Sequence, residues 1–421
     1  MNLSNGLKPL SIYDKLLLPN YRQNCIVHIP NHIKYLQGLK EQSVLAVSEM
    51  KLDIKKTVLF IIDGFGYKQW HEHQPYSTVL SKIASEGVVS SVTSMFPSST
   101  APSITGLSTG LTTQQHGLIE WLMYEQLSDQ IITTLPFKSI RGERDNLRGQ
   151  VSPSVLISNP TLFQDLSENC VKTYSLVSEQ YAKSTYSTLA YAGSTVISFE
   201  TVEGLFVELT DILQSNEKIH VNVYWDKIDS AGHNYGPNSN EYALAVKDFF
   251  DAFEHFLRTP ELSTYSDDTQ ILLTADHGQV TVDPQSTVWL DELPFLVDNL
   301  DLNKKGEKLL PWGLQRDVYL KVKDSKLDTT VLALREHLKD RAVVLKSHDA
   351  LESGLFGYGE LHPDFKTRIG NIIIIAAADN TVWYRHYDDE EFNYKGMHGG
   401  LTADETQIAF AQCPLNKLLM I

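Results

Sequence analysis

Continuous apolar runs separated by helix-like patterns are the feature that most constrains how this chain can fold. The runs are too continuous to have one wet face, and they occupy residues 57–62, 88–95, 219–225, 270–275, 371–377 and 407–412. The helix-like patterns include 78–87, ending at a glycine, the block after Thr100, 201–214, and 239–257, which opens on Ser239 or Asn240 as its cap. Strands that alternate with helices predict an α/β fold with a largely parallel sheet covered on both faces.

The length of the chain predicts more than one structural unit. A single core rarely grows beyond ~250–300 residues, and this chain has 421. From about 295 to 368 the pattern changes to a strand, a helix and a strand, at 317–322, 329–340 and 342–346. We therefore predict an N-terminal extension packed on the core over 1–50, a catalytic core over 51–295 and 369–421, and an inserted cap subdomain over 296–368. The cap would cover the site and govern substrate choice.

Polar residues with metal-binding or nucleophilic side chains follow several of the apolar runs. The ends of strands are where open α/β sheets bind ligands. Hydrolysis of a phosphate ester is well served by two cations about 3.5–4 Å apart, which clamp the attacking and leaving oxygens. Histidine nitrogen and carboxylate oxygen suit a catalytic zinc with three protein ligands. We predict one site from Asp229, His233 and His398, and a second from Asp63, Asp276 and His277, with the Thr100 oxygen as its fourth ligand.

Thr100 is the predicted nucleophile. Pro102 and the following residues indicate that a helix begins here, with Thr100 as its N-cap and proline in the first turn. A helix N-terminus attracts phosphate, and a bound metal lowers the pKa of a hydroxyl group. Ser98 and Ser99 are alternative nucleophiles, but the cap position favours Thr100.

Each of these segments also has a purely structural interpretation. Asp63-Gly64 and Asp276-His277-Gly278 are typical of turns, Thr100 of a helix cap, and His398 of a loop. Asp229 and His233 are four residues apart and could be a solvated pair on a helix. Five such coincidences would have to occur together, so we interpret the segments as one site.

The motifs resemble those of the type I phosphodiesterase/nucleotide pyrophosphatase branch of the alkaline phosphatase superfamily. The resemblance runs from about residue 55 to the C-terminus and is carried by Asp-Gly-Phe after the first strand, FPSSTAPS with the later TGL and HG, DSAGHNYGP, ADHG and HGG. It implies an alkaline phosphatase-like three-layer sandwich with a mostly parallel central sheet. A threonine nucleophile argues against the alkaline phosphatases proper and against sulfatases.

The resemblance also implies a covalent mechanism. Thr100 would attack phosphorus and form a phosphothreonine or its ester, which an activated water then hydrolyses. The metal held by Asp229, His233 and His398 would activate the water. The metal held by Asp63, Thr100, Asp276 and His277 would activate the threonine.

We therefore predict a metal-dependent hydrolase that cleaves a phosphodiester or pyrophosphate bond. The alternatives are a phosphomonoesterase or phosphonate hydrolase of the same superfamily and, from a different class, a non-catalytic metal-binding protein, which the complete ligand set disfavours. The predicted cofactors are two divalent metal ions, zinc first, with manganese and iron as alternatives.

Two positions depart from the pattern of the nucleotide-cleaving members. These usually carry an aromatic residue directly after the threonine and an asparagine two positions further, where this chain has Ala101 and Ser103. A preference for nucleotides is therefore not implied. Ser103 could still donate a hydrogen bond to the phosphoryl group, and Tyr235 either lines the substrate site or only packs.

For three further features the sequence supports two interpretations each. His116 recurs in the resemblance, but a structural role at the end of the nucleophile helix is favoured. Asp226 is a ligand only if the register is shifted, and otherwise a supporting or surface carboxylate. The segment 138–150, with Lys138, Arg141, Arg144 and Arg148, either meets a second anionic group of the substrate or is a solvated loop.

Composition limits the partners. With 36 basic and 52 acidic residues, the formal charge of -16 disfavours a nucleic-acid polymer. The start of the chain lacks the pattern of a secretory signal, and no run approaches the ~20 apolar residues of a membrane span. The three cysteines, Cys25, Cys170 and Cys413, are widely spaced, which fits a reducing compartment. We predict a cytoplasmic protein that acts on a small-molecule phosphoester without a membrane, and the oligomeric state is left open.

Overall fold

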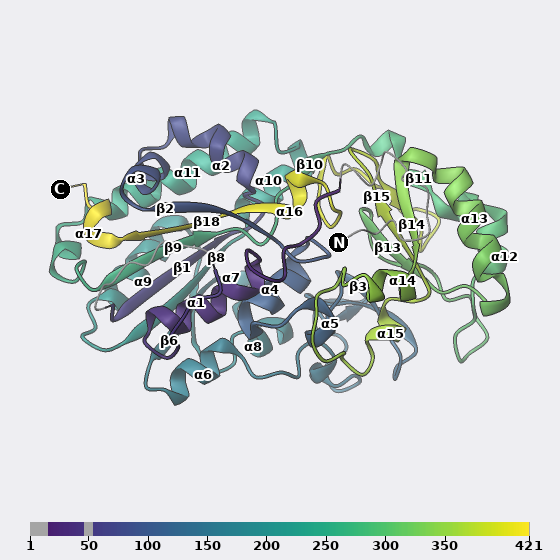
Figure 1. Cartoon of the computed structure of the whole chain (residues 1–421), viewed down its shortest axis with the longest axis horizontal. Coiled ribbons are helices and arrows are strands. Elements are labelled where there is room, and N and C mark those ends of the chain that lie inside the picture. Colours follow the sequence, from purple (N-terminus) through teal and green to yellow (C-terminus); the bar gives the residue numbers. More distant parts are fainter. Residues whose placement is uncertain (1–15, 46–53, 421) are drawn as a thin grey trace.

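A seven-stranded sheet forms the centre of the larger lobe of the molecule (Figure 1). The computed structural model describes residues 16–45 and 54–420. The strand order is β2-β18-β9-β1-β8-β6-β7. In chain order the strands are β1 (Lys56–Ile62), β2 (Val88–Thr93), β6 (Lys172–Ser178), β7 (Thr195–Phe199), β8 (Ile219–Trp225), β9 (Thr269–Thr274) and β18 (Gln407–Pro414). β18 runs opposite to the other six strands, which share one direction, so the predicted α/β fold with a mostly parallel sheet is confirmed.

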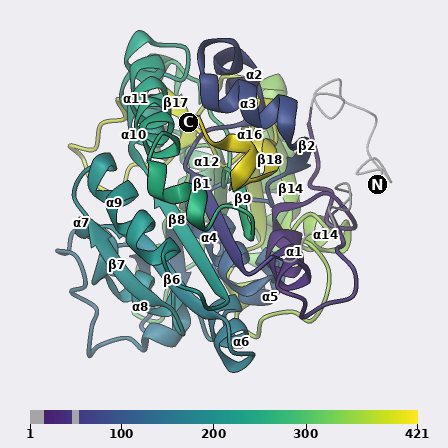
Figure 2. The same ribbon diagram turned by 90° about the vertical axis from the view of Figure 1, so that its left-hand side faces the viewer.

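Helices cover both faces of this sheet and make a three-layer sandwich. One outer layer contains α2 (Tyr67–His73), α3 (Thr78–Glu86), α9 (Val202–Leu213) and α11 (Asn240–Leu257). The other contains α1 (Ile29–Leu36), α4 (Thr100–Thr109), α6 (Leu162–Glu168) and α8 (Thr185–Ala190). Figure 2 shows the layers from the side. Phe60 of β1 packs on the rings of Phe206 and Phe253, with the Phe60 and Phe253 centroids 4.7 Å apart, so this side chain anchors β1 to α9 and α11 of the first layer.

The helix boundaries follow the capping signals of the sequence. The pattern predicted to end at Gly87 is α3, and Gly87 is its C-cap. The 239–257 pattern is α11, where the Ser239 hydroxyl accepts a hydrogen bond from the Tyr242 N–H at 3.1 Å. Of the two cap candidates, Ser239 is therefore the N-cap.

A second sheet of four antiparallel strands forms the core of the smaller lobe (Figure 1). Its order is β12-β13-β15-β14, and the strands are β12 (Trp312–Leu314), β13 (Asp317–Leu320), β14 (Ala342–Lys346) and β15 (Ile372–Ala376). Helix α13 (Leu327–Leu338) connects β13 to β14 and packs against β14.

The strand predicted at 371–377 exists, but we grouped it wrongly with the central strands. It is β15, which lies between β13 and β14 in the second sheet. All its residues are buried, and a short run buried on both faces has the same apolar pattern in either sheet. Conversely, β6 and β7 of the central sheet were not predicted, because serine and threonine interrupt their apolar residues. The domain boundaries at 296 and 368 stay a prediction, and β15 extends the second sheet beyond the latter.

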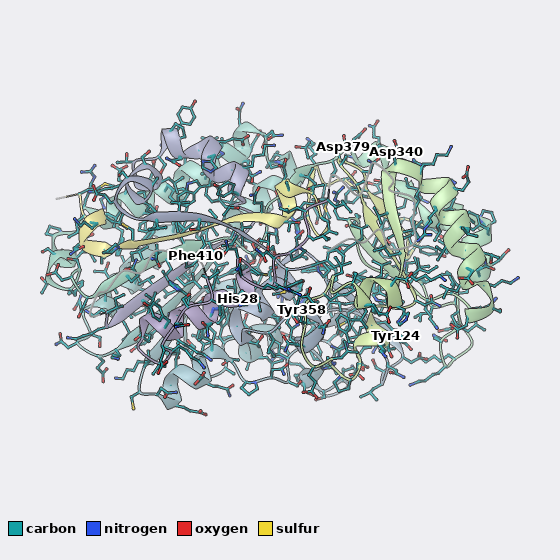
Figure 3. The ribbon with its side chains drawn as sticks, in the orientation of Figure 1. His28, Tyr124, Asp340, Tyr358, Asp379 and Phe410 are labelled. Atoms are coloured by element: carbon teal, nitrogen blue, oxygen red, sulfur yellow. The ribbon has the colours of Figure 1, made fainter. Side chains whose placement is uncertain are left out.

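A three-stranded sheet leaves the larger lobe after α4 and reaches the smaller one. It consists of β3 (Leu122–Glu125), β4 (Gln130–Thr133) and β5 (Lys138–Ser139). The ring of Tyr124, labelled in Figure 3 beside the smaller lobe, lies 5.7 Å from the ring of Trp312 in β12. This contact packs the three-stranded sheet against the second sheet.

The N-terminal residues that the structure describes lie against the larger lobe. The Leu17 N–H donates to the Leu401 carbonyl at 2.7 Å, and the Thr93 N–H donates to the Asn24 carbonyl at 2.9 Å. Of the extension predicted over 1–50, residues 1–15 and 46–50 lie outside the described residues. Within 16–45 and 54–420, no helix combines the length and apolar character needed to cross a membrane.

Candidate active site

The first predicted ligand group lies at the carboxyl ends of two neighbouring parallel strands. Asp63 directly follows β1, and Asp276 and His277 come two and three residues after β9. His277 Nε2 lies 3.3 Å from Asp63 Oδ1 and 3.5 Å from Asp276 Oδ2, and all three side chains are buried. Thr100 Oγ1 lies 3.1 Å from the same nitrogen. The structure thus brings together all four members of the group.

The second group comes from a helix and a distant loop. Asp229 and His233 lie on α10 (Lys227–Tyr235), which follows β8, and their four-residue spacing places both on one face. His398 follows β17 (Gly396–Met397). His233 Nε2 lies 3.3 Å from Asp229 Oδ2, and His398 Nε2 lies 3.2 Å from His233 Nε2. In each of the two groups, the three protein ligand atoms lie within 4.8 Å of one another.

The two groups share one site. The rings of His277 and His398 are stacked with their centroids 3.6 Å apart. Both groups contribute to the lining of a cavity of about 780 Å³, through Asp63 and Thr100 from one and Asp229, His233 and His398 from the other. The two ligand groups therefore lie next to each other at the edge of the central sheet.

Backbone carbonyls orient all three histidines in the same way. The Nδ1 atoms of His233, His277 and His398 face the carbonyls of Gly396, Gly278 and Ser98 at 2.8, 3.0 and 3.3 Å. A carbonyl only accepts, so each Nδ1 carries the proton and each Nε2 presents a lone pair. His233 Nε2 and His398 Nε2 are then two acceptors 3.2 Å apart. Such a pair needs a cation, or a proton, between them.

One oxygen of each carboxylate in the first group lacks a hydrogen-bond partner in the described part of the chain, whereas the other oxygen is bonded. Among the described residues, Asp63 Oδ1 and Asp276 Oδ2 are buried without a hydrogen-bond partner. Burial, together with the charges of Asp276 and Asp229, raises the pKa of Asp63 well above its usual value. Burial also opposes ionisation of Asp229. When His233 Nε2 carries a proton in place of a metal ion, the charge of the ring and its hydrogen bond outweigh burial and lower the pKa of the Asp229 carboxyl. Unpartnered buried oxygens and lone-pair nitrogens are what a divalent metal neutralises, so the residues fit two cations.

Thr100 is the first residue of α4 rather than its N-cap, which corrects our prediction by one position. Ser99 has extended backbone angles, φ -141° and ψ 156°, and is the N-cap. Its hydroxyl donates to Glu120 Oε1 at 2.6 Å, and the Ser98 hydroxyl donates to the Gly400 carbonyl at 2.7 Å. Both alternative nucleophiles are therefore buried and engaged. Ser99 and Thr100 both line the cavity, but only the Thr100 hydroxyl, of these three, contacts His277 Nε2 of the first ligand group.

The two predicted substrate-binding residues are placed elsewhere. Ser103 is fully buried, and its hydroxyl pairs with that of Ser94 at 3.0 Å. Tyr235 is 51% exposed at the end of α10. Neither is among the residues that line the cavity.

The structure places His116 and Asp226, each of which had two interpretations, outside the two ligand groups. His116 is buried in α5 (Thr113–His116), where its Nδ1 accepts from the Leu118 N–H at 3.1 Å, so it supports the chain locally. Asp226 lines the cavity but belongs to neither ligand group, and it accepts from Tyr181 at 3.0 Å and Gln180 at 3.1 Å.

Two supporting residues were missed by the sequence analysis. The Tyr224 hydroxyl donates to Asp63 Oδ2, and Gln279 Nε2 donates to Asp229 Oδ1 and, at 3.1 Å, to the Asp229 carbonyl. Tyr224 lies one residue before the end of β8, which runs beside β1. The sequence feature that could have indicated Tyr224 is its polar hydroxyl inside an apolar run, on the strand next to the one that precedes Asp63.

Replacing Tyr224 with phenylalanine should weaken metal binding at the Asp63 group by about 10- to 100-fold, because loss of a hydrogen bond to a ligating carboxylate has that typical effect. Competition with a chelating dye would measure the affinity. Tyr265→Phe is the control, since the Tyr265 hydroxyl is buried without a hydrogen-bond partner among the described residues. Equal affinity in the two variants would contradict a role for Tyr224.

Comparisons with known proteins identify the family that the chain matches. A family described as type I phosphodiesterase / nucleotide pyrophosphatase matches residues 57–401. Ectonucleotide pyrophosphatase/phosphodiesterase family member 3 of Mus musculus is 24% identical over 230 residues, which cover 54% of this chain and 25% of that protein. The Bos taurus protein of the same name is 23% identical over 248 residues, covering 58% and 26%. The matched part thus spans about a quarter of these curated relatives.

Solved structures show the same fold at low sequence identity. Murine ectonucleotide pyrophosphatase / phosphodiesterase 5 is 18% identical, with a TM-score of 0.63, covering 85% of this chain and 87% of that chain. A second murine structure of that protein is an inactive threonine-to-alanine variant in complex with AMP, at the same TM-score of 0.63 and 18% identity, covering 86% and 88%. Phosphonoacetate hydrolase from Sinorhizobium meliloti is 16% identical, with a TM-score of 0.60, covering 86% and 94%.

Proposed function

Because the chain belongs to the type I phosphodiesterase/nucleotide pyrophosphatase family, we propose that it hydrolyses a phosphodiester or pyrophosphate bond in a small molecule through a covalent intermediate on Thr100. The observation that carries the proposal is the arrangement of the site. Thr100 Oγ1 lies 3.1 Å from His277 Nε2 of one ligand group, and the stacked ring of His398 belongs to the other. A nucleophile beside two cation sites suits phosphoryl transfer.

The residues of the two groups would hold one divalent ion each, with zinc as the first choice and manganese or iron as alternatives. Asp63, Thr100, Asp276 and His277 would hold one ion, and Asp229, His233 and His398 the other. Bound ions would lower the pKa of hydroxyl and water groups and offset the charge that develops on the phosphoryl oxygens.

The chain itself supplies the nucleophile and its alignment. Thr100 Oγ1 attacks phosphorus, the alcohol or phosphate on the opposite side leaves, and a phosphothreonine ester results. Water then attacks the same phosphorus, breaks its bond to Oγ1 and restores the threonine. The first turn of α4 presents N–H groups without intrahelical acceptors, which favours the anionic phosphoryl group at this position.

Relatives give limited support for a nucleotide substrate. The inactive variant of murine ectonucleotide pyrophosphatase / phosphodiesterase 5 forms a complex with AMP, which is a property of that protein. Here Ala101 lines the cavity at the position directly after the nucleophile and offers a base no aromatic surface. We therefore propose a small phosphoester without assigning a nucleobase, and we retain the prediction of a cytoplasmic location as part of this proposal.

A monoesterase or phosphonate hydrolase is the second candidate, because the fold is shared with phosphonoacetate hydrolase. The test is the ratio of kcat/KM for bis-p-nitrophenyl phosphate to that for p-nitrophenyl phosphate, on protein stripped of metal and reloaded with zinc or manganese. We expect a ratio of at least about tenfold in favour of the diester, or about 1.4 kcal/mol in the barrier. A ratio well below one would instead support the monoesterase, and turnover of phosphonoacetate alone would support the phosphonate hydrolase.

A further inference from the structure

Two cationic side chains line the cavity of the candidate active site without belonging to either ligand group. Lys138 lies on β5, and Arg144 lies in the turn region that follows. Among the described residues that line the cavity, they are the only lysine and arginine. Both belong to the segment 138–150, whose sequence is compatible either with binding an anionic group of the substrate or with a solvated loop.

Neither cation is neutralised by the protein. Within the described part of the chain, no ion pair joins Lys138 or Arg144 to a carboxylate. Arg148 of the same segment differs, because it donates to Thr185 at 2.6 Å and lies 3.2 Å from Asp145 Oδ2. Arg148 thus holds the segment together, whereas the charges of Lys138 and Arg144 face the cavity unpaired.

The neighbouring carboxylates of the cavity already have other donors. Asp226 accepts from Tyr181 and Gln180, and Glu390 accepts from the Trp383 indole and the His386 N–H, both at 2.7 Å. The Arg144 guanidinium lies 5.6 Å from the centre of the Tyr181 ring, a cation–π contact that places it on the cavity wall. The wall therefore combines these cations with carboxylates that already have other partners, including Lys227 at 4.0 Å from Asp226 Oδ2.

We infer that Lys138 and Arg144 bind a second anionic group of the substrate, a carboxylate or a phosphate, distinct from the phosphoryl group that Thr100 attacks. This inference rests on the proposed function. A cavity of about 780 Å³ holds a small molecule that reaches both regions. In a chain with a formal charge of -16, such a pair of cations gives an anionic substrate a specific place to bind.

Matched synthetic diesters test this assignment. Propyl p-nitrophenyl phosphate would be compared with its carboxyethyl and phosphoethyl counterparts, and with longer spacers, on the metal-loaded full chain at low ionic strength. The wild type should show a kcat/KM about tenfold higher for an anionic ester at one spacer length, the usual size of a charge-assisted contact. Comparing kcat/KM for the carboxyethyl and phosphoethyl esters shows which anion is preferred.

The variants Lys138→Met and Arg144→Gln, and their combination, should bring the ratio of anionic to propyl ester down towards one. Lys183→Gln is the control, because Lys183 is exposed and is not among the residues that line the cavity. A wild type without preference at any spacer length, or a double variant that keeps it, would overturn the inference.

A binding measurement separates this inference from the proposed function. Titration calorimetry would compare carboxyethyl phosphonate with propyl phosphonate on the wild type and the double variant, which requires no turnover. If the wild type cleaves no diester but binds the carboxyethyl compound about tenfold more tightly, and the double variant loses that difference, the anion site stands and the proposed reaction fails. Equal binding of the two phosphonates would refute the anion site whatever the activity.

Discussion

Replacement of Thr100 by alanine is expected to lower kcat/KM for the preferred diester by about 10³-fold or more, while the protein keeps its fold and nearly its full metal content. In the proposed mechanism the loss is large because the Thr100 hydroxyl oxygen forms the covalent bond to phosphorus, and removing a nucleophile leaves only binding and electrostatic effects. Metal content should persist, since Asp63, Asp276 and His277 remain as ligands. Steady-state kinetics and metal analysis of the same preparation would measure both.

Two matched variants control this experiment. Thr100→Ser keeps a hydroxyl and should retain measurable turnover, with a covalent phosphoserine in place of the phosphothreonine. Ser99→Ala removes the neighbouring hydroxyl, which belongs to a residue that also lines the cavity but donates to Glu120 Oε1 at 2.6 Å. Its turnover should stay within about tenfold of wild type, the scale of one lost hydrogen bond to a charged group. A Thr100→Ala protein with wild-type turnover would refute the covalent mechanism.

The convergence of the candidate site residues was predictable from the sequence because most of them follow strand or helix signals. Asp63 and Asp276 come after apolar runs that form neighbouring parallel strands, and parallel strands end at the same edge of a sheet. Asp229 and His233 share a helix face through their spacing alone. His398 was assigned by its motif, because its place in the site depends on a loop that returns from the smaller lobe.

The parts that the sequence did not reveal depend on contacts between distant segments. Tyr224 supports Asp63 through a bond between strands, and nothing in the local pattern of β8 indicates which neighbour its hydroxyl meets. The placement of β15 between β13 and β14 follows from pairing, which apolar content does not specify. The family motif predicted that Ser103 binds the substrate, but in the folded chain its hydroxyl forms a hydrogen bond with the hydroxyl of Ser94.

Removal of the metals should have the second large effect, on activity and stability together. A strong chelator should lower turnover at least about 100-fold, and zinc or manganese should restore it, because in the proposed mechanism the ions would supply the charge stabilisation of the reaction. The stripped protein leaves Asp63 Oδ1 and Asp276 Oδ2 buried without partners, so it should also melt at a lower temperature. Ligand present at about 100 times its Kd contributes about 2.7 kcal/mol to the free energy of unfolding. Scanning calorimetry with and without chelator would measure the shift.

Substitution of single ligands separates the two groups. His398→Ala should lower the metal content of one group, and Asp276→Asn that of the other, so each variant should hold about one ion fewer than wild type. His337→Ala, on the exposed surface of α13, is the matched control and should bind the full complement. If the two ligand groups bound metal only through the negative charge of their carboxylates, His398→Ala would lose no more metal than His337→Ala. A specific loss in His398→Ala and in Asp276→Asn would mean that the stacked histidines join two separate centres, which is the arrangement that a double clamp on one phosphoryl group requires.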